Sequence, residues 1–253
     1  MPACPGSPSD VWTVPQRPGV CCVATARVRD PEEPGMSPTL PLPHELYLLS
    51  HVPAKSRLDD DSALVRGSLL RAAAVADLRI AGLLRDRDGK AERAPGPAPG
   101  GLDPFLAEVL DSVRPDRPRR WFGVVDHHWH TAERAVRESL VATGTITAER
   151  RRVLLVVPAR RIEVPDRGPV QELRDRVRDA VLGGEDPGAV PIGDAVLAVL
   201  ADEGNVRTVF RRRELRAHKP AVRALNERVD RELPGLRTAM SWSVAARRTA
   251  ATS

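Results

Sequence analysis

Apolar residues recur at helical spacing along most of the chain after residue 36. The segment 63–84 is apolar around most of its circumference, which is typical of a central, buried helix. Shorter segments with one apolar face predict further helices at about 43–50, from 104 onward, and at 121–143, 169–182, 191–203, 219–232 and 238–248. The pattern therefore predicts a mainly α-helical fold, in which amphipathic helices surround a central bundle.

A β-hairpin interrupts this helical pattern. The apolar residues 153–157 and 162–164 predict two strands that turn near Pro158. The polar stretch 85–89 is expected to end the central helix, and the Pro- and Gly-rich stretch 94–101 is expected to be a connection without secondary structure.

The first part of the chain lacks this periodicity. Residues 1–37 are rich in Pro, Gly and Ser and predict a disordered leader, whereas 38–248 predict a single domain. Met36 is a candidate translation start. All three cysteines precede Met36, so we expect reduced, incidental thiols. No apolar run approaches the roughly 18 to 20 residues of a membrane-spanning helix, and no secretory signal is visible, so we expect a cytoplasmic protein.

Arginine dominates the basic residues. The chain has 39 Lys and Arg against 34 Asp and Glu, and only Lys55, Lys90 and Lys219 are lysine. Arginine binds phosphate in a bidentate fork, which favours an anionic partner. The accompanying Ala and Pro bias also fits a GC-rich, bacterial genome.

No enzymatic motif is present. The sequence has no GxSxG elbow, no phosphate-binding loop and no GxGxxG after a strand, so we expect neither catalysis nor a cofactor. Residues 126–130 hold three histidines and an aspartate, yet no HExxH pattern or Cys pair supplies further ligands. We expect a solvated histidine cluster rather than a metal site.

Two arginine runs, 150–152 and 211–213, raise the question of nucleic acid. Both lack interleaved aromatic residues and have an adjacent acid, Glu149 or Glu214, so a solvated surface is expected. A DNA-binding regulator that uses 153–164 as a wing is the alternative.

Several segments, in their order along the chain, resemble the Golgi phosphoprotein 3 family and its bacterial, actinomycete-like relatives. They are the starting segment LPLPHELYLL at 40–49, VADLRIAGL at 75–83, LDPFL at 102–106, the helix-opening Trp121, and LVATGTITAER at 140–150. The resemblance spans residues 38–232. It implies a helical bundle, a hairpin at 152–164 used in self-association, and a basic pocket for phosphatidylinositol 4-phosphate. In eukaryotic relatives it also implies docking of short protein tails.

The family's lipid pocket can be carried over position by position. A Trp and an Arg flank the start of its central helix, and two Arg three residues apart lie on the helix before the LVxxG segment. Here Ser62 stands in the Trp position and Arg71 retains the first Arg. His130 and Glu133 stand in the paired Arg positions.

Two nearby arginines are candidates to replace the missing pair, because Arg134 and Arg137 share a helix face with His130. The candidate headgroup-binding residues are therefore Arg71, His130, Arg134 and Arg137. The resemblance implies a peripheral, non-catalytic adaptor at the inner membrane surface that binds a phosphoinositide or other anionic phospholipid headgroup. The alternatives are a cytosolic protein-interaction scaffold that does not bind lipid and, ranked lower, the DNA-binding regulator.

Overall fold

The computed structural model describes residues 40–153, 157–184 and 186–252, with the backbone alone at 150–153 and 157–159. The chain divides into two units, Met1–Thr39 and Leu40–Ser253. The predicted leader, 1–37, lies outside the described residues. All that follows concerns the second unit.

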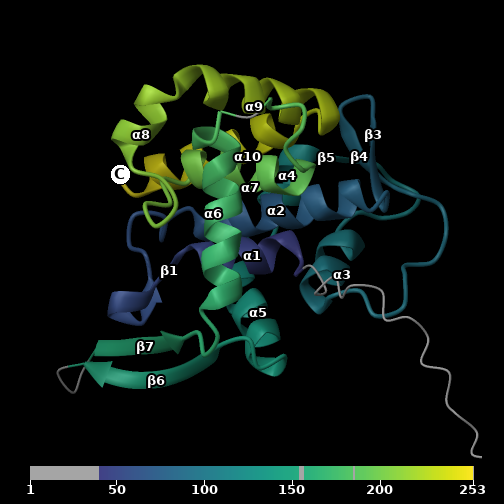
Figure 1. The fold of residues 1–253 in the computed structure, drawn as a ribbon. Coiled ribbons are helices and arrows are strands. Elements are labelled where there is room, and N and C mark those ends of the chain that lie inside the picture. Colours follow the sequence, from purple (N-terminus) through teal and green to yellow (C-terminus); the bar gives the residue numbers. More distant parts are fainter. Residues whose placement is uncertain (1–39, 154–156, 185, 253) are drawn as a thin grey trace, which may run out of the picture. The chain divides into compact units, whose positions relative to one another are not determined.

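The described residues form ten α-helices and three small antiparallel sheets, which confirms the mainly α-helical prediction (Figure 1). The helices are α1 (Leu42–Leu49), α2 (Arg66–Ile80), α3 (Pro104–Asp111), α4 (Trp121–Val125), α5 (Trp129–Ala142), α6 (Gly168–Leu182), α7 (Ile192–Glu203), α8 (Arg212–Ala217), α9 (Lys219–Glu232) and α10 (Leu236–Ala250).

Helix α2 is the centre of the bundle, since it packs against α1, α3, α4, α5, α7 and α10. Its residues 66–76 and Leu78 are all buried. Small side chains let the surrounding helices approach closely: a Cβ at Gly67 would lie 2.1 Å from the carbonyl oxygen of Trp129. The apolar circumference seen in the sequence thus corresponds to a helix that is covered on all sides as far as Ala76.

The predicted helix 121–143 is two helices, and the prediction of one continuous helix is wrong. The chain leaves the helical conformation between α4 and α5, where His128 adopts a left-handed backbone conformation with φ of 48°. This conformation is strained for a residue with a Cβ, and it redirects the chain from α4 into α5.

A three-stranded sheet follows α2, in the place of the predicted polar end. Strand β3 (Leu84–Arg87) pairs with β4 (Lys90–Arg93), which pairs with β5 (Arg119–Arg120). Asp88 and Gly89 connect β3 to β4 with φ of 51° and 74°, the positive angles that a tight two-residue hairpin turn requires.

The hairpin predicted from residues 153–164 exists, but the prediction that it turns near Pro158 is wrong. Strands β6 (Thr147–Val153) and β7 (Val157–Glu163) are paired throughout, and Pro158 lies inside β7 opposite Arg152. Residues 154–156, which connect the two strands, lie outside the described residues. A short sheet of β1 (His51–Val52) and β2 (Arg57–Leu58) adjoins the hairpin, where the Ile162 amide donates to the Ser56 carbonyl at 2.7 Å.

The helices of the described unit are too short or too polar to cross a lipid bilayer.

Candidate functional site

Arg71, the family arginine retained in the sequence, is buried inside the bundle. Its side chain has no exposed surface. Nη1 donates to both carboxylate oxygens of Glu108, at 2.9 and 3.0 Å, and Nη2 donates to the Val124 carbonyl at 3.2 Å. Burial lowers the pKa of Arg71, and Glu108 opposes that effect. A phosphate at the protein surface therefore cannot reach this guanidinium without opening the core.

Two of the positions that correspond to the family pocket, Ser62 and Glu133, belong to a largely buried polar network. The Ser62 hydroxyl donates to Asp59 Oδ2 at 2.7 Å and accepts from Arg66 Nε at 3.2 Å. Arg66 Nη1 donates to Glu133 Oε2 at 2.9 Å, and Arg137 Nη1 lies 3.6 Å from Glu133 Oε1. All but Glu133 are buried. Two carboxylates balance the two guanidinium groups, so this location has no net positive charge for a headgroup.

The other two predicted residues are exposed. Arg134 Nε donates to Glu138 Oε1 at 2.7 Å in a solvent-exposed pair. The exposed His130 ring lies edge-on to Trp129, with centroids 5.9 Å apart. Arg71 and Arg137 are thus buried and paired with different carboxylates. Arg134 is paired with a third carboxylate at the surface. Three of the four predicted headgroup-binding residues are thus engaged by carboxylates and His130 is exposed, and their joint binding of one headgroup stays a prediction.

A histidine and glutamate cluster lies beside Arg71. Potential ligand atoms of Glu108, His127 and His128 all lie within 4.8 Å of one another, and the two imidazole rings are stacked with centroids 3.8 Å apart. However, Arg71 occupies both Glu108 oxygens, and Arg119 Nη2 is 3.5 Å from His127 Nδ1. Burial, followed by neighbouring cationic groups, lowers the pKa of His127. The positive charges of Arg71 and Arg119 would repel a divalent cation at this cluster. We therefore interpret the cluster as part of the environment of the Arg71–Glu108 ion pair rather than as a metal site.

A hollow of about 530 Å³ opens between the β3–β4 turn, the start of α4 and α10. Four exposed residues at this hollow define what we call the basic–aromatic face: Lys90, Arg120, Phe122 and Trp242. Trp242 is 68% exposed and Phe122 is 42% exposed, both high values for such large apolar side chains. One acid, Asp88, also lines the hollow.

The two cations of this face lie directly opposite each other, because Lys90 and Arg120 are cross-strand partners in the β4–β5 ladder. Like charges in this arrangement repel and destabilise a sheet. Neither side chain makes a salt bridge within the described part of the chain. Such a violation of a local stability rule is a common mark of a functional surface.

Trp121 fixes the orientation of its neighbours. Its ring is buried, its Nε1 donates to Asp86 Oδ1 at 2.5 Å, and the Arg79 guanidinium stacks over it at 4.8 Å. A Cβ at Gly235 would lie 2.7 Å from Trp121 Cδ1, so glycine leaves room for the ring. With Trp121 directed inward at the start of α4, the adjacent Phe122 is left exposed.

The sequence pattern alone does not indicate this face, although part of its signal is visible. The run Arg119-Arg120-Trp121-Phe122 places cations next to aromatic residues, but the pattern predicts only a helix start at Trp121. Trp242, about 120 positions later, could be joined to it only by the fold.

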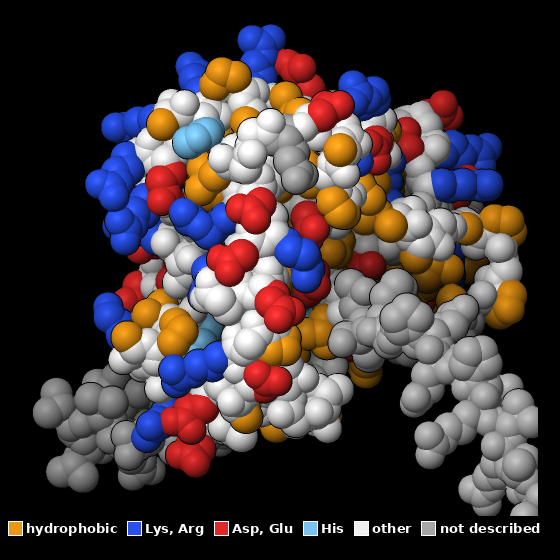
Figure 2. Space-filling view, in the orientation of Figure 1, with side chains coloured by type: hydrophobic (Ala, Val, Ile, Leu, Met, Phe, Trp, Pro, Cys, Tyr) orange, Lys and Arg blue, Asp and Glu red, His pale blue; other side chains and the backbone are white. Residues whose placement is uncertain are grey.

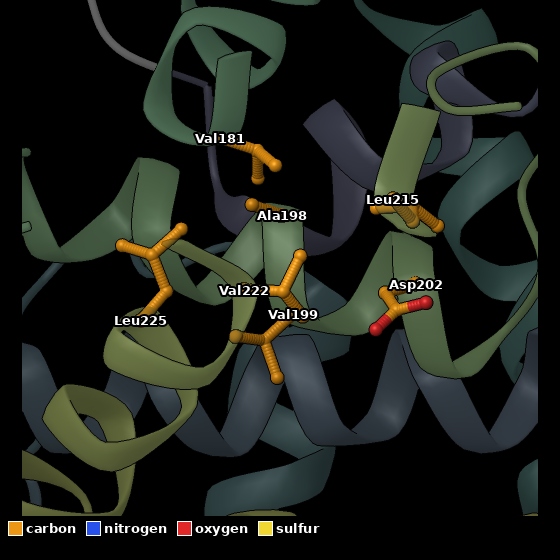
Figure 3. A pocket seen from close by; sticks show the side chains of 7 residues that line it. All are labelled: Val181, Ala198, Val199, Asp202, Leu215, Val222 and Leu225. Atoms are coloured by element: carbon orange, nitrogen blue, oxygen red, sulfur yellow. The ribbon is translucent and has the colours of Figure 1, made fainter. Parts of the chain in front are cut away.

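A further hollow, between α6, α7, α8 and α9, is too small for a cofactor. It is lined mainly by apolar side chains and has a volume of about 10 Å³, room for about one water molecule (Figure 3). Asp202 is the one acid among its lining residues, and burial raises the pKa of that carboxyl.

Comparison with known proteins gives one family. A family model described as Golgi phosphoprotein 3 (GPP34) matches residues 42–250, from the first residue of α1 to the last of α10. No curated protein matches the chain significantly.

Proposed function

The chain belongs to the Golgi phosphoprotein 3 family, and from that premise we propose that it is a non-catalytic, peripheral protein that binds anionic lipid surfaces through its basic–aromatic face. The family suggests an adaptor of the phosphatidylinositol 4-phosphate-binding kind. The proposed partner is the lipid surface that the family suggests, but the proposed contact is the basic–aromatic face rather than Arg71.

The observation that carries the proposal is the juxtaposition of exposed Trp242 and Phe122 with Lys90 and Arg120, two cations that make no salt bridge to a described residue. Aromatic side chains favour the boundary between headgroups and acyl chains. Each Lys or Arg near an anionic membrane surface contributes about 1 kcal/mol of attraction. An anionic surface would also relieve the repulsion between the two cross-strand cations.

Charge attraction, rather than selection of one headgroup, is the mode of binding that we propose. Arg71 and Arg137 are engaged by Glu108 and Glu133, so the fork geometry needed to select a phosphomonoester is absent from these two side chains. Binding should therefore follow the total surface charge of the vesicle and weaken as salt is added.

Vesicle flotation tests this. Neutral phosphatidylcholine vesicles are compared with vesicles made equally negative by phosphatidylserine or by phosphatidylinositol 4-phosphate. We expect similar recovery of the full chain with both anionic vesicles, and little with neutral ones. The double variant Phe122→Ala/Trp242→Ala should lower recovery, whereas Arg134→Ala, which removes an exposed cation elsewhere, should not.

Two results would contradict the proposal. Failure to float with any anionic vesicle would remove lipid binding altogether. Recovery only with phosphatidylinositol 4-phosphate vesicles, abolished by Arg71→Met in a folded protein, would instead support a headgroup-binding pocket at Arg71 on α2.

The second candidate function is a protein-interaction scaffold that does not bind lipid. The observation that favours it is the neutral, buried network of Asp59, Arg66, Glu133 and Arg137 in the position of the family pocket. Retention of a protein partner without lipid retention would support it. Self-association through the hairpin at 152–164 and docking of short protein tails stay predictions.

A further inference from the structure

A second basic surface surrounds α8 and shares no residue with the basic–aromatic face. Figure 2 shows Lys and Arg side chains gathered where α8 lies, at the left of the view. We call this surface the arginine patch, and its exposed members are Arg207, Arg211, Arg212, Arg213 and Arg216. Among these, only Arg207 makes a salt bridge in the described part of the chain, to Asp61 at 3.2 Å.

A hollow of about 380 Å³ adjoins the arginine patch, between α6 and the segment that leads into α8. Four arginines and two carboxylates are among its lining residues, which are completed by Gln171, Thr208 and Val209. The arginines are Arg174, Arg178, Arg207 and Arg211, and the carboxylates are Asp175 and Glu214. Arg207 and Arg211 belong to both features, so the hollow and the patch form one continuous positive surface.

One pair within the hollow is fixed. Arg178 Nη2 donates to Glu214 Oε1 at 3.0 Å, and the Arg211 backbone amide donates to Glu214 Oε2 at 2.7 Å. Hydrogen bonds from Arg178 and Arg211 lower the pKa of Glu214 to about 2. Arg178 and Glu214 therefore neutralise each other and leave the remaining arginines to set the charge of the hollow.

Arg174 has an unsatisfied donor at this hollow. Its Nη1 donates to Gln171 Oε1 at 3.2 Å and its Nη2 lies 3.5 Å from the His51 carbonyl oxygen. Its Nε is buried and makes no hydrogen bond to a described residue. Because this Nε has almost no accessible surface, a ligand in the hollow would meet the terminal nitrogens instead, and Arg174 makes no salt bridge to a described residue that would neutralise its charge.

We propose that the hollow and the arginine patch form a docking site for an acidic polypeptide segment, with one partner carboxylate bound at Arg174 and Arg211. This site goes beyond lipid binding, because it gives the adaptor a separate surface for a protein partner.

One observation favours an acidic polypeptide over single-stranded nucleic acid. Phe210 is the only Phe, Tyr or Trp between residues 205 and 223, and it is buried, so the patch offers no exposed Phe, Tyr or Trp ring for base stacking.

The test is fluorescence anisotropy with the full chain and a short labelled peptide of alternating Glu and Ser. A peptide with Gln in place of Glu is the neutral comparison. We expect Arg174→Met and Arg211→Ala each to weaken binding of the Glu peptide about tenfold. Arg223→Ala is the matched control, because Arg223 is an exposed cation on α9 paired with Glu227 and lies outside the hollow; it should change affinity less than about twofold.

Several outcomes would overturn the proposal. The first is an equal loss of affinity for the Glu peptide in Arg223→Ala and Arg211→Ala. The second is binding of the Gln peptide as tight as that of the Glu peptide, or tighter binding of a DNA oligonucleotide. The third is stronger competition by inorganic phosphate than by acetate at equal ionic strength. If Arg174→Met fails to fold by circular dichroism, the exposed Arg211→Ala variant decides alone. Because no vesicle is present, these results stand apart from the flotation assay.

Discussion

The ion pair between Arg71 and Glu108 joins a guanidinium with no exposed surface to a carboxylate that is 39% exposed. This asymmetry predicts unequal costs when either partner is removed. In Glu108→Ala the buried Arg71 charge loses its counter-ion and keeps only the Val124 carbonyl as acceptor. Breaking a buried pair in this way destabilises a protein by about 3 to 5 kcal/mol.

Arg71→Met removes the other partner at a smaller cost. Methionine fills most of the same volume with apolar atoms, and the part-exposed Glu108 carboxylate can turn to water. The lost hydrogen bonds should then cost about 1 to 2 kcal/mol. Since whole domains are stable by only about 5 to 15 kcal/mol, a difference of about 2 kcal/mol between the variants is measurable.

Urea unfolding followed by circular dichroism gives both free energies of unfolding. The exposed pair of Arg134 and Glu138 provides the control, and Arg134→Ala should leave stability essentially unchanged. If Arg71→Met proves as costly as Glu108→Ala, or more so, the argument from unequal burial is wrong. If Arg71→Met also leaves flotation unchanged, Arg71 acts in folding rather than in lipid contact.

Two further predictions concern packing and pH. Gly67→Ala would place a Cβ 2.1 Å from the Trp129 carbonyl oxygen, so α2 and α5 must separate. We expect the free energy of unfolding, measured in urea, to fall by about 3 kcal/mol or more. The control is Gly100→Ala, where no atom lies within 4 Å of the added Cβ, and its unfolding midpoint should be unchanged. Burial raises the pKa of Glu45 from 4.5 to about 7, although the nearby Arg176 acts to lower it. Between these two pKa values the folded state holds a proton that the unfolded state releases. The free energy of unfolding therefore falls as pH rises from 4.5 through about 7. Glu45→Gln should therefore be more stable than the unchanged protein at about pH 8, by up to about 3 kcal/mol, and closely similar at about pH 4; an equal difference at both pH values would refute the assignment.

The sequence predicted the helices best where the apolar pattern is long and continuous. The predicted 63–84 helix corresponds to α2 at Arg66–Ile80, and 219–232 corresponds to α9. Periodicity could not reveal the break at His128, since a single left-handed residue leaves the apolar pattern nearly intact. The β3–β4 hairpin was predictable from Asp88-Gly89, a common turn pair, but the charged strands on either side concealed it.

The candidate site was less predictable, because its chemistry depends on contacts distant in sequence. The register predicts that Ser62 and Glu133 depart from the family pocket, and in the structure both belong to one largely buried polar network. The partner of Arg71 lies 37 positions away on α3. A sequence pattern identifies a guanidinium, but only the fold shows which carboxylate already neutralises it.

Adjacent positions on α10 face opposite environments. Trp242 is exposed, whereas the Ser243 hydroxyl lies 2.8 Å from the Ser68 hydroxyl of α2 and 2.8 Å from Asp126 Oδ1. Arg247, one turn further on, also binds Asp126. Helix α10 therefore carries an exposed indole on one side and hydrogen bonds to α2 and Asp126 on the other, so α10 cannot detach from the bundle without breaking contacts at its centre.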